Sequence, residues 1–378
     1  MEMSLQRGSL KIATVFGIPI RVHFSWLIIF GLITWSLSTS YFPVAAPRLP
    51  QASYWMSGAT AALLLFVSVA LHELSHSFVA RKYRIPIEDI TLFIFGGVAR
   101  INGEPATPKA EFRMAIAGPL CSLILALAFF ITEQAIHSQV VQAIFSYLAT
   151  LNLMLGIFNL IPGYPMDGGR VVRAYLWQKS GNLLTATQRA SRYGERIALL
   201  FIFLGLISLF TGFPGGLWFM LIGWFLFSAA QASLNQASLQ DSLGGIHVGD
   251  IMARDIVALS PEVTIKEAVN DYFLRYGYGG FPVLDKGEFL GFVTLREAKD
   301  RPRENWAATT VSEVLVPHER SWEVGRKDSA MKALEMMIRE DQGRLPVMEQ
   351  GRLVGIITRN GIARYVQIKG QIKEEQNV

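Results

Sequence analysis

Two histidines separated by three residues lie inside a long apolar segment, in His72-Glu73-Leu74-Ser75-His76. Residues four apart lie on one face of a helix, so both imidazoles can bind one metal ion while Glu73 reaches a metal-bound water. An isolated motif of this kind recurs by chance, but here the surrounding residues 54–79 are apolar. Charged groups at the centre of a membrane helix cost about 2.5–3.5 kcal/mol each, so a polar cluster there indicates a functional site.

A catalytic zinc ion takes three protein ligands and leaves one position for water, so a third ligand must come from elsewhere. Asp167 is the strongest candidate, because it directly follows an apolar span and lies between prolines and Gly168-Gly169, which hold a tight turn. The other acidic residues of this half lie in loops or at span ends and are expected to be solvated charges: Glu88, Asp89, Glu104, Glu111 and Glu133. The sequence therefore predicts one zinc ion on His72, His76 and Asp167.

A zinc site of this composition suits the hydrolysis of a peptide bond. The metal lowers the pKa of its bound water toward about 7, and Glu73 is placed to accept the proton and pass it to the departing amine. Asn159, at the end of the apolar span before Asp167, is the best-placed donor for the developing oxyanion. A position at a helix end, or a hydrogen bond between helices, accounts for this asparagine equally well.

Composition divides the 378-residue chain into two parts. Hydrophobic residues make up 51% of it, and nearly all of the apolar excess lies before residue 235.

The formal charge of +5 does not indicate a nucleic-acid partner, because the basic residues border the apolar spans. The single cysteine, Cys121, excludes an intramolecular disulfide and a cysteine-based zinc cage. Residues 1–21 do not have the pattern of a cleaved signal peptide.

Six apolar segments are predicted to cross the membrane as helices, at residues 23–41, 54–81, 110–132, 140–161, 197–210 and 217–232. The fifth is the weakest, because Gly212-Phe213-Pro214-Gly215-Gly216 leaves little room for a turn, and a basic amphipathic segment at 171–196 precedes it. Residues 12–22 alternate like a short strand. Residues 91–101 are apolar but too short to span, which favours a short membrane-associated β-hairpin.

The distribution of basic residues predicts the orientation. Of the sixteen Lys and Arg residues before residue 235, only Arg48 lies in a loop opposite the N-terminus. Basic residues favour the cytoplasmic side, so the sequence predicts a multi-pass protein of the cell membrane with its N-terminus in the cytoplasm. Six spans then return the chain to the cytoplasm, and His72, His76 and Asp167 lie at one level near that face.

The polar part of the chain contains an internal repeat with an offset of 63 or 64 residues. Phe281-Pro282-Val283-Leu284 recurs as Leu345-Pro346-Val347-Met348, and Gly291-Phe292-Val293-Thr294 recurs as Gly355-Ile356-Ile357-Thr358. Each unit is predicted to contain two helices, two strands and a closing helix, which makes a cytosolic α/β pair. The predicted domains are a six-span domain at 1–235, a pair at 246–368 with repeats at about 246–300 and 309–366, and a polar tail at 369–378.

The motifs of the first part resemble those of the site-2 protease family of intramembrane zinc metalloproteases. The resemblance rests on the histidine motif and on the stretch from Asn159 to Gly169, and through Phe95-Gly96-Gly97 and Ala117-Gly118-Pro119 it covers about residues 17–173. It implies that His72, His76 and Asp167 bind Zn2+, that Glu73 activates water, and that the substrate is a transmembrane helix which unwinds at the site. It also implies a sheet beside the site, formed by the segments that begin at Gly17 and Phe95, whose edge at Gly96 and Gly97 can pair with the substrate. No PDZ-like domain is visible.

The repeated part resembles a tandem pair of cystathionine-β-synthase (CBS) domains from residue 248 to about residue 366. Such pairs often bind ATP, ADP or AMP through a threonine that is followed three positions later by aspartate. Here Thr294 is followed by Glu297 and Thr358 by Gly361, so the pattern is degraded in both halves. Nucleotide binding therefore competes with a purely structural or dimer-forming role, and the resemblance implies association into a homodimer through these domains.

Two functions fit these features. The first is a zinc metalloendopeptidase that hydrolyses a peptide bond in or near the transmembrane segment of a membrane-protein substrate, as in regulated intramembrane proteolysis, with the CBS pair modulating it. The second is a CBS-regulated metal-ion transporter or channel, in which the buried His and Asp bind the permeating ion. Hydrolysis needs a carboxylate between two metal ligands and transport does not, so Glu73 favours the protease.

Overall fold

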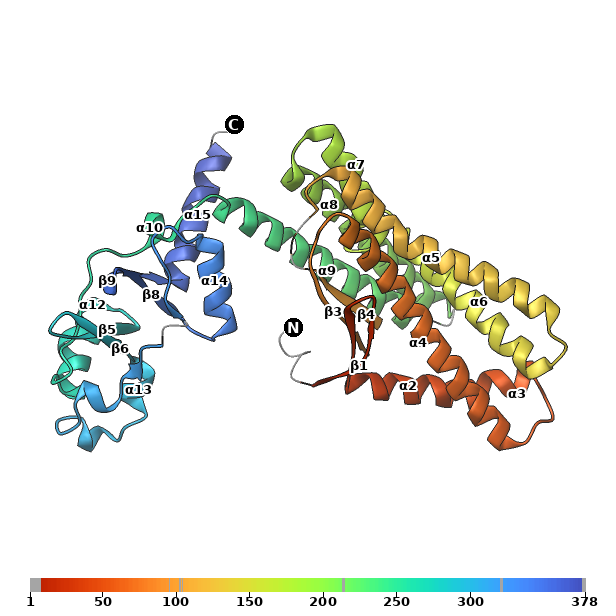
Figure 1. Cartoon of the computed structure of the whole chain (residues 1–378), viewed down its shortest axis with the longest axis horizontal. Coiled ribbons are helices and arrows are strands. Elements are labelled where there is room, and N and C mark those ends of the chain that lie inside the picture. Colours follow the sequence, from red (N-terminus) through yellow and green to blue (C-terminus); the bar gives the residue numbers. More distant parts are fainter. Residues whose placement is uncertain are drawn as a thin grey trace. The chain divides into compact units, whose positions relative to one another are not determined.

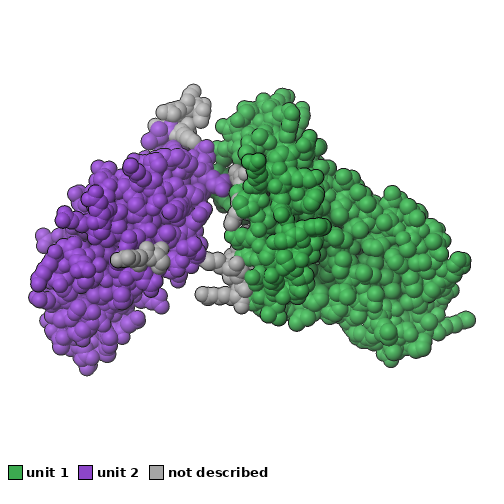
Figure 2. Space-filling view, in the orientation of Figure 1, with its two compact units in different colours: residues 1–237 green, residues 238–378 purple. Residues whose placement is uncertain are grey.

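The computed structural model describes residues 8–94, 96–101, 103, 105–212, 215–319 and 322–375. The chain divides into two compact units, Met1–Ala237 and Ser238–Val378 (Figure 2). The first unit is built from long helices and one small sheet, whereas the second contains shorter helices and strands (Figure 1). The predicted fold class, a helical membrane domain joined to an α/β pair, is confirmed.

Six helical segments of the described residues are long and apolar enough to cross a membrane, as predicted. The first is α2 (Ser25–Ser36), which continues through a π-helical turn, η1 (Leu37–Tyr41), into α3 (Phe42–Ala45). The others are α4 (Gln51–Lys82), α5 (Pro108–Ala135), α6 (Gln139–Asn159), α8 (Leu183–Thr211) and α9 (Gly216–Leu243). Helices α4, α5 and α6 pack against one another and form the part of the unit that carries the histidine motif (Figure 1).

The fifth span is the C-terminal half of a single 29-residue helix, α8. The basic segment at 171–196 is not one element, because it is divided between α7 (Asp167–Ser180) and the start of α8. The division falls at Gly181, which ends α7 with a φ of +69° in the left-handed region that favours glycine. Asn182 then caps α8, its side-chain oxygen accepting a hydrogen bond from the backbone N of Thr185 at 3.0 Å.

The predicted hairpin is one half of a four-stranded sheet. Strands β3 (Ile87–Phe93) and β4 (Gly96–Ile101) form that hairpin, and β1 (Ser9–Val15) and β2 (Ile18–His23) form a second one. Strands β2 and β3 pair in parallel, which gives the order β1-β2-β3-β4 and leaves β1 and β4 at the edges. Phe95, part of the family resemblance, lies outside the described residues.

The prediction that Asp89 is a solvated charge is wrong. Asp89 is 3% exposed on β3, and its carboxylate lies 3.2 Å from Nε of Arg21 on β2 and accepts hydrogen bonds from Arg100 on β4. A buried carboxylate is tolerated when it is paired in this way. The ion pairs therefore join three neighbouring strands, and no local pattern in the sequence revealed them. Glu104 lies outside the described residues.

The two repeats of the second unit exchange their opening segments. The first repeat contains a helical segment at 265–276, β5 (Gly280–Asp285), β6 (Glu288–Thr294) and α13 (Leu295–Lys299). The second contains α14 (Ala330–Arg339), β8 (Arg344–Glu349), β9 (Arg352–Thr358) and α15 (Arg359–Glu375). Val248 and Met252, which open the first repeat, lie in the core of the second, whereas Val311, which opens the second, lies in the core of the first. Each repeat therefore completes the core of the other.

Candidate active site

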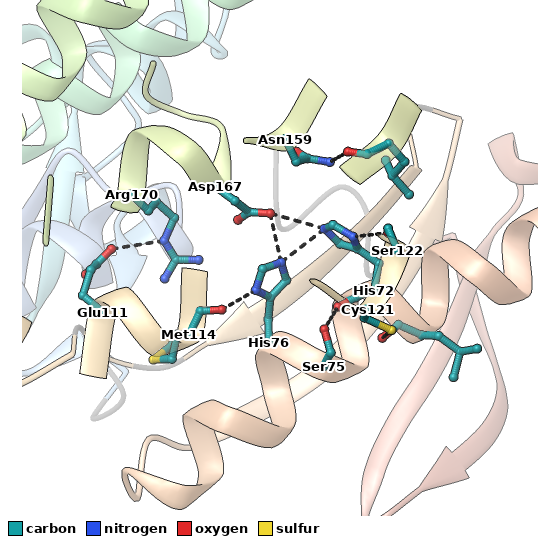
Figure 3. A network of polar contacts seen from close by, with 12 residues as sticks. His72, Ser75, His76, Glu111, Met114, Cys121, Ser122, Asn159, Asp167 and Arg170 are labelled. Atoms are coloured by element: carbon teal, nitrogen blue, oxygen red, sulfur yellow. Dashed lines mark hydrogen bonds and ion pairs between the residues drawn. The ribbon is translucent and has the colours of Figure 1, made fainter. Parts of the chain in front are cut away.

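The two histidines of α4 and the first residue of α7 point toward one another (Figure 3). Oδ2 of Asp167 lies 3.3 Å from Nε2 of His72 and 3.1 Å from Nε2 of His76. The two Nε2 atoms are 3.2 Å apart, and none of the three residues is more than 8% exposed. Three donor atoms that are distant in the sequence therefore converge on one buried point.

These distances fit a tetrahedral zinc ion. Zn–N and Zn–O bonds of about 2.0–2.1 Å place two tetrahedral ligand atoms about 3.3–3.4 Å apart. The three observed separations, from 3.1 to 3.3 Å, agree with that geometry. In the part of the chain that the structure describes, this trio is the one group of His, Cys, Asp or Glu side chains arranged to hold a metal ion. Two imidazoles and one carboxylate would leave the fourth position of a zinc ion for water, as in hydrolytic zinc sites.

Helix α5 orients both imidazole rings (Figure 3). Nδ1 of His72 lies 2.8 Å from Oγ of Ser122, and Nδ1 of His76 donates to the carbonyl oxygen of Met114 at 2.7 Å. A bond to a carbonyl requires the proton on Nδ1, which leaves Nε2 of His76 free to bind a metal. Neither partner was predicted from the sequence. Ser122 had a signal in the sequence, because it lies three residues after Ala117-Gly118-Pro119. Met114 had none, because it acts through its backbone carbonyl, which does not depend on residue type.

Gly118 provides the space that the two rings occupy. A Cβ atom at this position would lie 2.6 Å from Nε2 of His72 and would overlap the ring of His76 more severely. In the sequence, Gly118 is part of the family resemblance through Ala117-Gly118-Pro119. The structure gives a physical reason for glycine at this position, because the imidazoles lie where a side chain would be.

Glu73 lies on α4 next to strand β4. A Cβ atom on Gly97 would lie 2.7 Å from Cγ of Glu73 and 3.3 Å from Cγ1 of Val69, so the strand can come this close only with glycine at position 97. Gly96 has a φ of +127°, which also favours glycine. Glu73 directly follows His72 on α4. Glu73 therefore lies one residue from a proposed metal ligand and against strand β4.

Asn159 is the last residue of α6, and its side chain is bonded within its own helix. Its Nδ2 donates to the carbonyl oxygen of Leu155 at 2.9 Å (Figure 3). One of the two N–H groups that were predicted to stabilise the oxyanion therefore already has an acceptor.

The prediction that Glu111 is a solvated charge is also wrong, because its side chain is fully buried. Oε1 of Glu111 accepts hydrogen bonds from Nη2 of Arg173 at 2.7 Å and from Nε of Arg170 at 3.2 Å. Both arginines belong to α7, and Arg170 lies 59 residues further along the chain. The ion pairs join α5 to the helix that begins at Asp167, a connection that the sequence analysis missed.

Thr294 and Thr358, the two residues predicted to bind a nucleotide, are the last residues of strands β6 and β9. The Thr294 hydroxyl donates to the Glu297 carboxylate, and the Thr294 backbone N donates to the same group at 2.9 Å, which forms a capping box. Oγ1 of Thr358 accepts a hydrogen bond from the backbone N of Gly361 at 3.0 Å. Both hydroxyls therefore have partners within their own turns.

Comparison with known proteins assigns the chain to a family. Residues 60–136 and 130–205 match the family model of peptidase family M50, and residues 248–302 and 311–368 match that of the CBS domain. The chain is 36% identical over 370 residues to Rip3 of Mycobacterium tuberculosis, which is assigned as a zinc metalloprotease, and the match covers 96% of this chain and 94% of Rip3. The chain belongs to peptidase family M50.

A second relative agrees with this membership of the M50 family. Zinc metalloprotease MJ0392 of Methanocaldococcus jannaschii is 33% identical, over 97% of this chain and 98% of its own. A solved site-2 protease from the same organism is 33% identical and covers 60% of this chain and 95% of its own, with a TM-score of 0.41. As an M50 peptidase the chain is a site-2 protease-like zinc metalloprotease, a multi-pass membrane protein with a pair of CBS domains. The predicted enzyme class is confirmed over the alternative of a metal-ion transporter or channel.

Proposed function

We propose that this M50 peptidase holds one zinc ion on His72, His76 and Asp167 and hydrolyses a peptide bond in or near a transmembrane segment of another membrane protein. The observation that carries the proposal is the convergence of three buried donor atoms within 3.3 Å of one another. When bound, zinc polarises the scissile carbonyl and makes water a stronger acid. The ligands come from α4 and α7, so both helices must be in place for the metal to bind.

In this proposal Glu73 is the general base. Its carboxylate accepts a proton from the attacking water and delivers that proton to the nitrogen that leaves. The position of Glu73, one residue from His72 and against β4, supports this role. Asn159 is the proposed donor to the oxyanion: one N–H of its Nδ2 donates to the Leu155 carbonyl, and the second N–H can donate to the substrate oxygen.

The outer edge of β4 is the proposed binding surface for the unwound substrate. An edge strand presents backbone N–H and C=O groups to which an extended segment can add as a further strand. Gly96 and Gly97 lie at the start of this strand, and Gly97 brings its backbone against Glu73. A substrate segment paired with β4 would therefore run past the general base.

Gly97→Ala tests this arrangement. The added Cβ would lie 2.7 Å from Cγ of Glu73, so either the strand or the carboxylate must shift. We expect cleavage to fall about tenfold or more, because a displacement of about 1 Å at a reacting group can cost 10²-fold. Zinc content should not change. Val98→Ala, whose side chain points to the opposite face of the strand, is the matched control and should cleave like the native protein. Native cleavage by Gly97→Ala would contradict the role of this strand.

The CBS pair, proposed to span 246–368, is the regulatory module in this account, and ATP, ADP or AMP is its proposed ligand at Thr294 and Thr358. The Thr294 hydroxyl already donates to Glu297, so a nucleotide phosphate must displace that bond, and we expect weak binding. The Thr358 hydroxyl accepts from Gly361 and can still donate to a phosphate. Calorimetric titration of the full-length protein should give heat that is lost in Thr294→Val/Thr358→Val. A titration without heat at millimolar nucleotide would contradict the proposed ligand and favour formation of a homodimer as the role of the pair.

The distribution of basic residues supports a cytoplasmic location for the N-terminus and for the CBS pair. Fifteen of the sixteen Lys and Arg residues before residue 235 lie on one side of the predicted spans. The protease domain at 1–235 would then cleave its substrate near the cytoplasmic face of the lipid bilayer. That location places the products within reach of cytoplasmic partners.

A further inference from the structure

One face of α5 carries groups that contact the proposed metal ligands. Glu111, Met114, Gly118 and Ser122 follow one another at intervals of three or four residues, so they form a single stripe along the helix. Ser122 bonds to His72, the carbonyl of Met114 bonds to His76, and Gly118 leaves the space that both rings fill. We call these four residues the α5 stripe. Glu111 lies at its N-terminal end and differs from the others, because its partners lie on α7 (Figure 3).

The partners of Glu111 belong to the first two turns of α7, close to the third ligand. Arg170 and Arg173 follow Asp167 by three and six residues, which correspond to about 4.5 and 9 Å along the helix axis. Both donate to the same oxygen, Oε1, Arg173 at 2.7 Å and Arg170 at 3.2 Å. Two successive turns of α7 are therefore attached to one atom of α5.

This contact sets the rotation of α7 as well as its position. Apolar side chains could join two helices without the cost of burying charges. Directed, charge-assisted hydrogen bonds add a geometric constraint, because both arginines reach Oε1 only when the face of α7 that carries Arg170 and Arg173 is turned toward α5. Asp167 projects from the same helix, so this rotation decides where Oδ2 points. Oε1 is the more strongly constrained oxygen, because Oε2 has no hydrogen-bond partner among the described residues.

We infer that Glu111 is a positioning residue of the metal centre, which holds α7 through Arg170 and Arg173 so that Asp167 meets His72 and His76. The inference rests on the metal site proposed above. The α5 stripe then acts on all three ligands, directly on the two histidines and through α7 on the aspartate.

Glu111→Gln tests the inference, because it keeps the size of the side chain and removes its charge. We expect Zn2+ to bind about 10–100-fold more weakly, the loss typical of a group that orients a metal ligand. Competition with a chromogenic chelator measures the dissociation constant. Co2+ in place of zinc gives a second measurement that a purely structural role would not change. Its visible absorption reports the number and geometry of the ligands, and we expect the spectrum to change as Asp167 is displaced.

Asp89→Asn is the matched control. Asp89 is also a buried carboxylate held by two arginines, but Arg21 and Arg100 join strands of the sheet and do not hold α7. Its substitution removes a buried charge of the same kind from the same unit. The zinc affinity and the cobalt spectrum of Asp89→Asn should equal those of the native protein.

In Glu111→Gln, Arg170 and Arg173 lose the negative charge with which they pair in the protein interior. Uncompensated positive charges there can prevent folding. If it does not accumulate as folded protein, the variant Glu111→Gln/Arg170→Gln/Arg173→Gln removes all three charges and takes its place in both measurements. A folded variant of either kind with native zinc affinity and a native cobalt spectrum would overturn the role of Glu111. A native protein that takes up no zinc would contradict the metal site itself, and with it this inference.

Discussion

Glu73→Gln is expected to lower the cleavage of a co-expressed membrane substrate by about 10²–10⁴-fold, the contribution typical of general acid–base catalysis. Glutamine has the shape of the native side chain, but its amide cannot accept the proton of the attacking water. His72, His76 and Asp167 are unchanged, so zinc should still bind and the fold should persist. The appearance of the cleaved product, followed by immunoblot or with purified protein in detergent, measures the effect.

Glu133→Gln is a suitable control for this experiment. Glu133 lies near the C-terminal end of α5, whereas Glu111 and the α5 residues that contact the proposed ligands lie nearer its N-terminal end. Glu133 is more than five helical turns from Glu111 and has no role in the proposed chemistry. Its variant should cleave at the native rate. Undiminished cleavage by Glu73→Gln would contradict the general base and the hydrolytic mechanism built on it.

Gly118→Ala is expected to remove zinc binding and cleavage together. The new methyl group would lie 2.6 Å from Nε2 of His72 and closer still to the ring of His76, so at least one imidazole must leave its position. We expect zinc affinity to fall by more than about 100-fold, the upper end of the loss for residues that only orient a ligand. Alanine stabilises a helix by about 1 kcal/mol relative to glycine, so a loss of zinc affinity cannot be attributed to a weaker helix. Zinc titration together with circular dichroism measures both effects.

Gly31→Ala is the matched control for Gly118→Ala. Gly31 lies within α2, and a Cβ atom there meets no heavy atom within 4 Å. The same substitution in another membrane helix should therefore leave zinc binding and cleavage unchanged. Native zinc affinity in Gly118→Ala would show that the imidazoles do not occupy the positions described for them.

Features that repeat along the chain were predictable from the sequence. The apolar spans and the CBS repeat are periodic or compositional patterns, and all six spans have counterparts in the structure. The histidine motif is local, so its helix places both rings on one face whatever the rest of the fold does. Asp167 was predicted as a ligand because a carboxylate among prolines and glycines directly follows an apolar span, which is an unusual context for a charge.

Features that depend on pairing between distant segments were not predictable. Glu111 and Asp89 occur near span and strand ends, where most carboxylates are solvated, and only their arginine partners make burial possible. The carbonyl of Met114 carries no signal in its residue type. The exchange of opening segments between the CBS repeats likewise leaves no local pattern. The union of two hairpins into one sheet was implied by the family resemblance and not by the residue pattern. These are the contacts through which the rest of the fold positions the three proposed ligands.

Zinc content and cleavage, measured on the same purified sample, test the central claim most directly. The account predicts one zinc ion per chain in the native protein and in Glu73→Gln, with cleavage by the native protein alone. A chelator that removes the metal should abolish cleavage, and Zn2+ added back should restore it. A native protein that continues to cleave its membrane substrate after all metal has been removed would contradict the account.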